Sequence, residues 1–273
     1  MTKRFFAAKA DFFGITVNTF SELPQPYCEM YVSKGYVKRA YFLGPLSLQS
    51  PPPPPAGDSS RWCIDWLEMK PDRSVVYLCF GSLVHVSDAQ LHELALGLEA
   101  SGKSFMWVVR AQNWSPPEGW EERVGDRGKL VTAWAPQTAI LAHPAVGAFV
   151  THCGWNSVLE TAAAGVPALT WPVVFEQFIT ERLLTGVLGM GERLRPDGAG
   201  VRSTRYEENE LVPAEAARSL VAFMRPGGAG DAAKGWATGL AVKARAAMAE
   251  GGSSHRDLRR LLEDLMGATS AGP

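Results

Sequence analysis

The feature that most constrains the fold is an alternation of apolar runs with helical repeats through most of the chain. Residues 75–80 form a continuous apolar run that Gly81 ends, which is typical of a strand buried on both faces. The next stretch places Leu91, Leu94 and Leu98 at helical spacing. This alternation predicts right-handed βαβ units and an α/β fold with a doubly wound parallel, Rossmann-like sheet.

The same pattern predicts where the other elements lie. Ser87 and Gln90 form a capping-box signature at the start of one helix, and Gly102 ends that helix. Further strands are predicted at residues 14–20, 37–43, 105–109, 130–134, 146–151, 167–171 and 191–194. Further helices are predicted at residues 22–33, 156–164, 176–188, 214–224, 232–249 and 256–266.

Five consecutive prolines at residues 51–55 mark a boundary. Proline removes a backbone donor and favours an extended path, so no core element runs through them. We expect a remnant of an N-terminal domain at residues 1–48, a linker at 49–61, a main domain at 62–250, and a C-terminal helix and tail at 251–273. A long surface loop within one domain is the alternative for the proline run.

Composition narrows the partners and the compartment. The net charge is -1, from 27 Lys and Arg against 28 Asp and Glu, so nothing favours nucleic acid or an anionic membrane. No apolar run reaches the roughly 20 residues that span a bilayer, and we identify no signal peptide. The four cysteines form no CxxC pair, which disfavours a zinc site and indicates a reduced, cytoplasmic setting.

Ligands of open α/β sheets bind at the carboxyl ends of the strands. The predicted strand at 146–151 is followed by His152, Gly154, Asn156 and Ser157 and then by a helix. Such a helix start favours an anion, so this segment predicts a pyrophosphate site. Ordinary helix capping by Asn156 and Ser157, and a structural His152, are the alternatives.

Other predicted strand ends also carry suitable side chains. Trp134 offers a face for a planar base, with core packing as its alternative. Gly81 and Ser82 supply another phosphate contact. Glu176 and Gln177 suit sugar hydroxyls, unless they only begin a solvated helix.

Several well-known motifs are missing from the places where they would bind phosphate. The predicted strand at 75–80 is followed by neither GxGxxG nor GxxxxGK[ST], and no Asp-x-Asp pair occurs. Redox enzymes that use dinucleotides, and NTPases, therefore lose their main support. We expect neither a cofactor nor a metal site.

Residues 134–177 read WAPQTAILAHPAVGAFVTHCGWNSVLETAAAGVPALTWPVVFEQ. This stretch closely resembles the signature box of plant family 1 UDP-dependent glycosyltransferases. FGS at residues 80–82 and the final GGSS followed by a helix are also similar to that family. The resemblance implies that the chain is the C-terminal, donor-binding domain of a GT-B fold.

The resemblance also implies a role for each matching residue. Trp134 would stack on uracil, and the backbone of Ala135 would contact the base edge. Gln137 and Glu160 would hold the ribose hydroxyls. The residues implied for the diphosphate are Ser82, His152, Gly154, Asn156 and Ser157. Those implied for the sugar are Trp155, Glu176 and Gln177, and the family associates a final glutamine with glucose.

The implied reaction transfers a sugar, with a lean to glucose, from a UDP-sugar to a hydroxyl of a small plant metabolite. The family inverts the anomeric centre without a metal, and the UDP-sugar is a co-substrate rather than a cofactor. Its general base is a His near the start of the acceptor domain, which nothing before residue 51 matches; His85 and His92 do not fit. We therefore expect a truncated chain that supplies the donor site for sugar transfer but is inactive alone. The alternative is a catalytically inactive fragment that binds a UDP-sugar.

Overall fold

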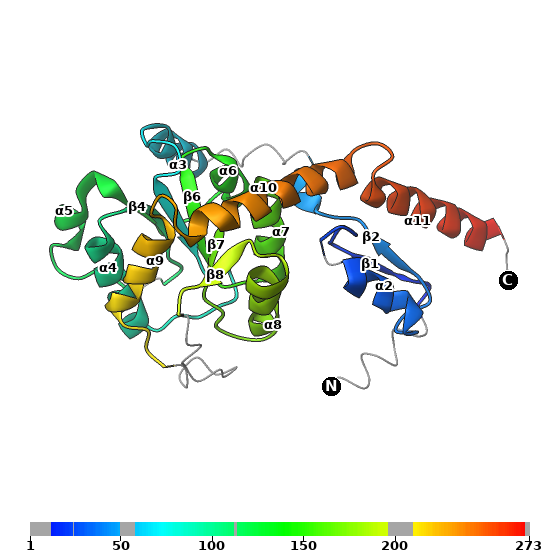
Figure 1. Ribbon diagram of the computed structural model, residues 1–273, viewed down its shortest axis with the longest axis horizontal. Helices are drawn as coiled ribbons and strands as arrows, with labels where there is room; N and C mark the ends of the chain where they lie inside the picture. The colour runs from blue at the N-terminus through cyan, green and yellow to red at the C-terminus, as the bar shows by residue number, and fades with distance from the viewer. Residues whose placement is uncertain (1–11, 24, 50–57, 112–113, 196–209, 271–273) are drawn as a thin grey trace. The chain divides into compact units, whose positions relative to one another are not determined.

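The computed structural model describes residues 12–23, 25–49, 58–111, 114–195 and 210–270 (Figure 1). Its contacts divide the chain into two compact units, one of residues 52–238 and one that combines residues 1–51 with 239–273. The boundaries differ from the predicted segments, because the C-terminal helix shares a unit with the N-terminal residues. The proline run at 51–55 lies outside the described residues.

The larger unit contains one parallel six-stranded sheet in the order β5-β4-β3-β6-β7-β8. This confirms the predicted doubly wound α/β fold. The chain winds outward from β3 to β5, then returns to place β6 on the other side of β3, so the strand order reverses between β3 and β6. The strands are β3 (Val75–Cys79), β4 (Ser104–Val108), β5 (Gly128–Val131), β6 (Val146–Thr151), β7 (Ala168–Thr170) and β8 (Gly191–Arg193).

The helices that connect these strands are α4 (Asp88–Ser101), α5 (Trp120–Val124), α6 (Gln137–Ala142), α7 (Trp155–Ala164) and α8 (Gln177–Arg182). Helix α3 (Asp58–Glu68) precedes β3, and α9 (Ala217–Phe223) and α10 (Ala229–Met248) follow β8. Short turns of helix lie at η1 (Leu46–Leu48), η2 (Gly125–Arg127) and η5 (Ala214–Ala216), and α8 continues into a π-helical turn, η3 (Leu183–Val187).

Helix α4 forms as predicted, with one difference at its start. Ser87 is the N-cap and accepts a hydrogen bond from the N–H of Gln90 at 3.3 Å, and Gly102 ends the helix in the left-handed conformation. The side chain of Gln90 does not complete the capping box. It bonds instead to both backbone groups of Val212, at 2.8 and 2.7 Å, because a distant segment offers it two partners.

The alternating faces of β3 belong to two hydrophobic clusters. Val76 and Leu78 pack with residues of α4, α5 and α9. Val75, Tyr77 and Cys79 pack with residues of α3 and α6. Successive side chains of a strand point to opposite faces, so the continuous apolar run of β3 serves both clusters at once.

In its described residues, the smaller unit contains a two-stranded parallel sheet of β1 (Ile15–Val17) and β2 (Ala40–Phe42), with helices α2 (Gln25–Ser33) and α11 (Ser253–Ser270). It also includes η1 and the end of α10. Helix α11 is bonded along β2: Asp264 accepts from the hydroxyl of Tyr41 at 2.6 Å, and Asp257 accepts from the N–H of Phe42 at 2.7 Å. The N-terminal residues thus gain packing from α11 that local sequence does not reveal.

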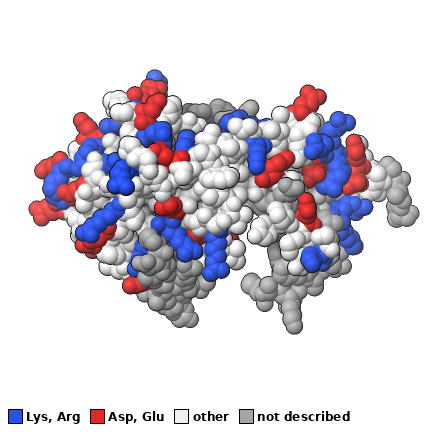
Figure 2. Space-filling view, in the orientation of Figure 1, with Lys and Arg blue, Asp and Glu red and all other residues white. Residues whose placement is uncertain are grey.

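The surface of the described residues is mixed in charge. Basic and acidic side chains are interspersed on the face shown in Figure 2, with uncharged areas between them. None of the helices in the described part of the chain combines the length and the apolar character needed to cross a bilayer. The four cysteines are all free and buried.

Candidate functional site

The residues predicted to bind a ligand follow four strands of the sheet at one edge. Ser82 follows β3, Trp134 to Gln137 follow β5, His152 to Ser157 follow β6, and Glu176 and Gln177 follow β7. All six strands are parallel, so their carboxyl ends meet at this edge, and β3 and β6 flank the reversal in strand order. Open sheets of this kind bind ligands at that position.

The loops after β3 and β6 meet at His152. Gly81 has φ +72, and a Cβ at this position would lie 2.8 Å from Nε2 of the imidazole. A Cβ on Gly154 would overlap the same Nε2. Only glycine therefore lets both backbones lie against the ring. Cys153, which lies between His152 and Gly154, is buried and has φ 67. It closes a tight turn in which its N–H donates to Thr151 Oγ1 at 3.2 Å.

His152 is almost buried, at 8% exposure. Burial lowers the pKa of His152 below its usual 6.5, and a hydrogen bond to the backbone of Cys79 and the negative charge of Glu176 only partly oppose this. The ring is therefore neutral at pH 7 and offers an N–H donor rather than a positive charge. The loops after β6 and β7 start side by side, because the N–H of Trp171 donates to the carbonyl of Thr151 at 2.8 Å.

The start of α7 is not capped by Asn156 or Ser157. The N-cap is Gly154, which makes no side-chain capping bond. Ser157 is buried and accepts a hydrogen bond from the amide of Gln137 at 3.1 Å. The capping alternative is therefore wrong for Ser157. Asn156 and Ser82 are exposed, and Trp155 is half-buried.

Gln137 and Glu160, predicted together for the ribose, are in direct contact. Nε2 of Gln137 donates to Oε2 of Glu160 at 2.6 Å. Burial raises the pKa of Glu160, and the hydrogen bond from Gln137 opposes that rise. The two residues come from α6 and α7, and the fold places them side by side.

Sequence reasoning missed Tyr77. Its hydroxyl donates to Oε1 of Gln137 at 3.2 Å from the middle of β3. A tyrosine in an otherwise apolar buried strand was the available signal, since a buried hydroxyl usually finds a partner.

Trp134 is 62% exposed, so core packing is not its role. Strand β5 ends at Val131, earlier than the predicted residue 134, and Trp134 lies in the loop beyond it. The guanidinium of Arg110 lies over its ring, 5.0 Å from the centroid. Sequence reasoning missed Arg110, although it too follows a strand. Ala135 is buried, and its carbonyl accepts from the N–H of Gln137 at 2.9 Å.

Glu176 and Gln177 differ in setting. Glu176 is exposed. Gln177 is only 5% exposed, and its Oε1 accepts from the backbone N–H groups of Val173 and Val174, each at 2.9 Å. The side-chain carbonyl of Gln177 therefore stabilises the loop that precedes α8. The alternative, that these residues only begin a solvated helix, fits Glu176 but not Gln177.

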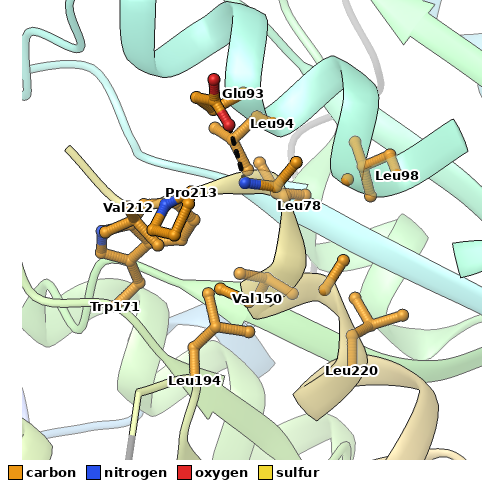
Figure 3. A pocket seen from close by; sticks show the side chains of 14 residues that line it. Leu78, Glu93, Leu94, Leu98, Val150, Trp171, Leu194, Val212, Pro213 and Leu220 are labelled. Carbon is orange, nitrogen blue, oxygen red and sulfur yellow. Dashed lines mark hydrogen bonds between the residues drawn. The ribbon is translucent and has the colours of Figure 1, made fainter. Parts of the chain in front are cut away.

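Two further features lie apart from these residues. An apolar cavity of about 30 Å³ lies between α4, η5, α9 and the sheet (Figure 3), and it includes none of the predicted site residues. Leu78, Val150 and Leu194 line it, and beside it the N–H of Ala214 donates to Glu93 at 2.7 Å. Among the described residues, no cluster of three or more His, Cys, Asp or Glu could hold a metal ion.

Comparison with known proteins agrees with this geometry. The family model described as UDP-glucoronosyl and UDP-glucosyl transferase matches residues 55–189. UDP-glycosyltransferase 73C4 of Solanum lycopersicum is 36% identical over 97% of this chain and 80% of its own length. The chain belongs to the UDP-glucoronosyl and UDP-glucosyl transferase family. The resemblance found in residues 134–177 is thereby confirmed.

Other members of this transferase family are longer than the chain. Scopoletin glucosyltransferase of Nicotiana tabacum is 41% identical over 95% of this chain and 56% of its own length. The chain thus spans about half the length of most of the curated relatives it matches. The structure of Medicago truncatula UGT71G1 complexed with UDP-glucose superimposes with a TM-score of 0.79 at 36% identity, covering 93% of this chain and 54% of that one.

Proposed function

We propose that this chain supplies the UDP-sugar donor site of a glycosyltransferase that acts on small plant metabolites. The observation that carries the proposal is the convergence of Trp134, the Gln137–Glu160 pair and the His152 loop at one edge of the sheet. In that order, these groups suit the binding of a base, a ribose and a diphosphate. A neighbouring solved structure of the same family holds UDP-glucose, which supports a nucleotide sugar as the ligand.

The proposed reaction is one in-line displacement. The acceptor hydroxyl attacks the anomeric carbon, UDP leaves with the electrons of the bond to that carbon, and the hydroxyl proton passes to a general base. The anomeric centre inverts, and no metal takes part. Glucose is the proposed sugar because Gln177 ends the signature box. Relatives named for glucosylating scopoletin and a flavonoid support a small hydroxylated acceptor. A cytoplasmic location remains part of the proposal, supported by four free thiols.

Binding of UDP tests the donor site directly. Isothermal calorimetry with residues 1–273 should show UDP binding that weakens in Trp134→Ala, which removes the stacking face, and in His152→Ala, which removes a diphosphate donor. Hydrogen bonds to charged groups contribute about 1.5–3 kcal/mol, so His152→Ala should lose roughly 10- to 150-fold in affinity. Unchanged affinity in a folded variant would remove that residue from the site.

A second candidate is that residues 1–273 bind a UDP-sugar but do not transfer the sugar unaided. Two of the histidines bond to their own turns: Nδ1 of His143 accepts from Ala145 at 3.2 Å, and Nδ1 of His255 accepts from Gly251 at 3.1 Å. His152 lies in the diphosphate loop. Residues 1–84 contain no histidine, whereas the family resemblance assigns the base to a histidine of the acceptor domain.

Turnover tests the second candidate. Incubation of residues 1–273 with UDP-glucose and a panel of phenols should yield no glucoside above a control without protein, because a positioned base contributes about 10²–10⁴-fold. Mass spectrometry of the products is the measurement. Glucoside formation at ordinary enzymatic rates would show that this chain contains its own base.

A further inference from the structure

A chain of polar contacts runs from the inside of the sheet to the predicted ribose residues. Tyr77 lies in β3 with its side chain fully buried. Its ring stacks on Phe149 of β6 with centroids 5.0 Å apart. The sheet thus fixes the ring, and the ring fixes the position of the hydroxyl, which donates to Oε1 of Gln137 at 3.2 Å.

These contacts determine how the Gln137 amide is oriented. The two hydrogens on Nε2 go to Oε2 of Glu160 at 2.6 Å and to Oγ of Ser157 at 3.1 Å. An ionised carboxylate only accepts hydrogen bonds. Turning the amide over would bring two oxygens together at Glu160. The hydroxyl of Tyr77 completes the arrangement by donating to the amide oxygen.

The Tyr77 hydroxyl remains a donor over the working range of pH. Burial raises the pKa of Tyr77 well above its usual 10, and the neighbouring Cys79 thiol, by charge and hydrogen bonding, and then the charge of Glu160 add to the effect. A protonated hydroxyl at a fixed place therefore faces the amide oxygen.

We propose that Tyr77 is a positioning residue for the ribose of the nucleotide sugar. It orients Gln137, and Gln137 in turn holds the Glu160 carboxylate where Oε1 accepts a hydrogen bond from a ribose hydroxyl. Tyr77 is too deeply buried to touch the nucleotide. This inference rests on the proposed donor site and assigns to a core residue of β3 a share in recognising the sugar of the nucleoside.

The test compares UDP with 2′-deoxy-UDP, which lacks one of the two ribose hydroxyls. Calorimetry should show that the unaltered chain prefers UDP. Tyr77→Phe keeps the ring and its stacking but removes the hydroxyl. It should weaken UDP binding about 3- to 10-fold, as expected for one hydrogen bond, and weaken 2′-deoxy-UDP less, so the preference narrows.

A matched control and a double variant sharpen the result. Tyr41→Phe removes another buried tyrosine hydroxyl, bonded to Asp264 in the smaller unit, and should leave the preference unchanged. In a Gln137→Met background, Tyr77→Phe should change UDP affinity no further, because the two residues act through one contact.

Three results would overturn the inference. One is an unaltered chain that binds UDP and 2′-deoxy-UDP equally, and another is a Tyr77→Phe variant that weakens both ligands alike or neither. Either of these two results would leave the proposed donor site unaffected. A chain that binds neither nucleotide would overturn the donor site together with this inference.

Discussion

The loop after β7 depends on one side-chain oxygen, and replacing Gln177 should reveal this. Oε1 of Gln177 accepts from the N–H groups of Val173 and Val174, each at 2.9 Å, and the side chain is 5% exposed. Gln177→Met keeps the length of the side chain but removes the acceptor. Val174 is buried and Val173 is partly exposed, so water can satisfy only the N–H of Val173.

The magnitude follows from those two N–H groups. A buried donor without a partner costs about 1–3 kcal/mol, and the partly exposed one costs less. We expect Gln177→Met to lower the free energy of unfolding by about 2 kcal/mol. In a domain of 150–250 residues, that is a fall of roughly 4–8 °C in Tm.

Gln177→Glu is the matched variant. A carboxylate keeps an acceptor for both N–H groups but has no amide hydrogens for a sugar. It should retain most of the stability and the affinity for UDP while binding UDP-glucose more weakly. Gln177→Met should weaken both ligands, because its loop is loosened.

Chemical denaturation and calorimetry with UDP and UDP-glucose provide the measurements. The reasoning fails if Gln177→Met is as stable as the unaltered chain and loses affinity for UDP-glucose alone. In that case Gln177 contacts only the sugar, and its bonds to the loop contribute nothing measurable.

Two more predictions concern the His152 loop. Gly81→Ala should destabilise the fold and abolish UDP binding, because its Cβ would lie 2.8 Å from the His152 ring. The control Gly102→Ala, with φ +65 and open space around it, should cost only about 1–2 kcal/mol, the strain of a left-handed alanine. Equal losses of stability in the two variants, measured by urea denaturation, would contradict this. Burial lowers the pKa of His152 below 6.5, so between the two pKa values the unfolded chain binds more protons and stability falls as pH drops below 6.5. A His152→Asn variant should lose less stability between pH 7 and pH 5, and a parallel loss in both proteins would refute the assignment.

Much of the site was predictable because its signals are local. The turn between β6 and α7 needs glycine at 154, and the helix start favours an anion; both are properties of a few adjacent residues. The prediction for Trp134 as a stacking face was of the same kind. Its exposure of 62% decides against core packing, which the local pattern left open.

The missed residues have their partners far away in sequence. Tyr77 meets Gln137 across 60 positions, and Arg110 lies over Trp134 from the end of a different strand. The local sequence gives at most a polar hydroxyl in an apolar strand for Tyr77 and a cation after a strand for Arg110. Only their partners give them a role.

The amino-acid sequence by itself determined the alternation of strands and helices, the cap at Ser87 and the order of the site residues, because each depends on neighbours within a few positions. The tertiary structure decided the rest. Strand order brings Ser82, Gln137, His152 and Gln177 to one edge, and helix α11 bonds to β2 across more than 200 positions. Gln177 also became a support for its loop. Such contacts depend on the order of the strands and on the packing of helices far away in sequence, and no local preference encodes which distant group a side chain will meet.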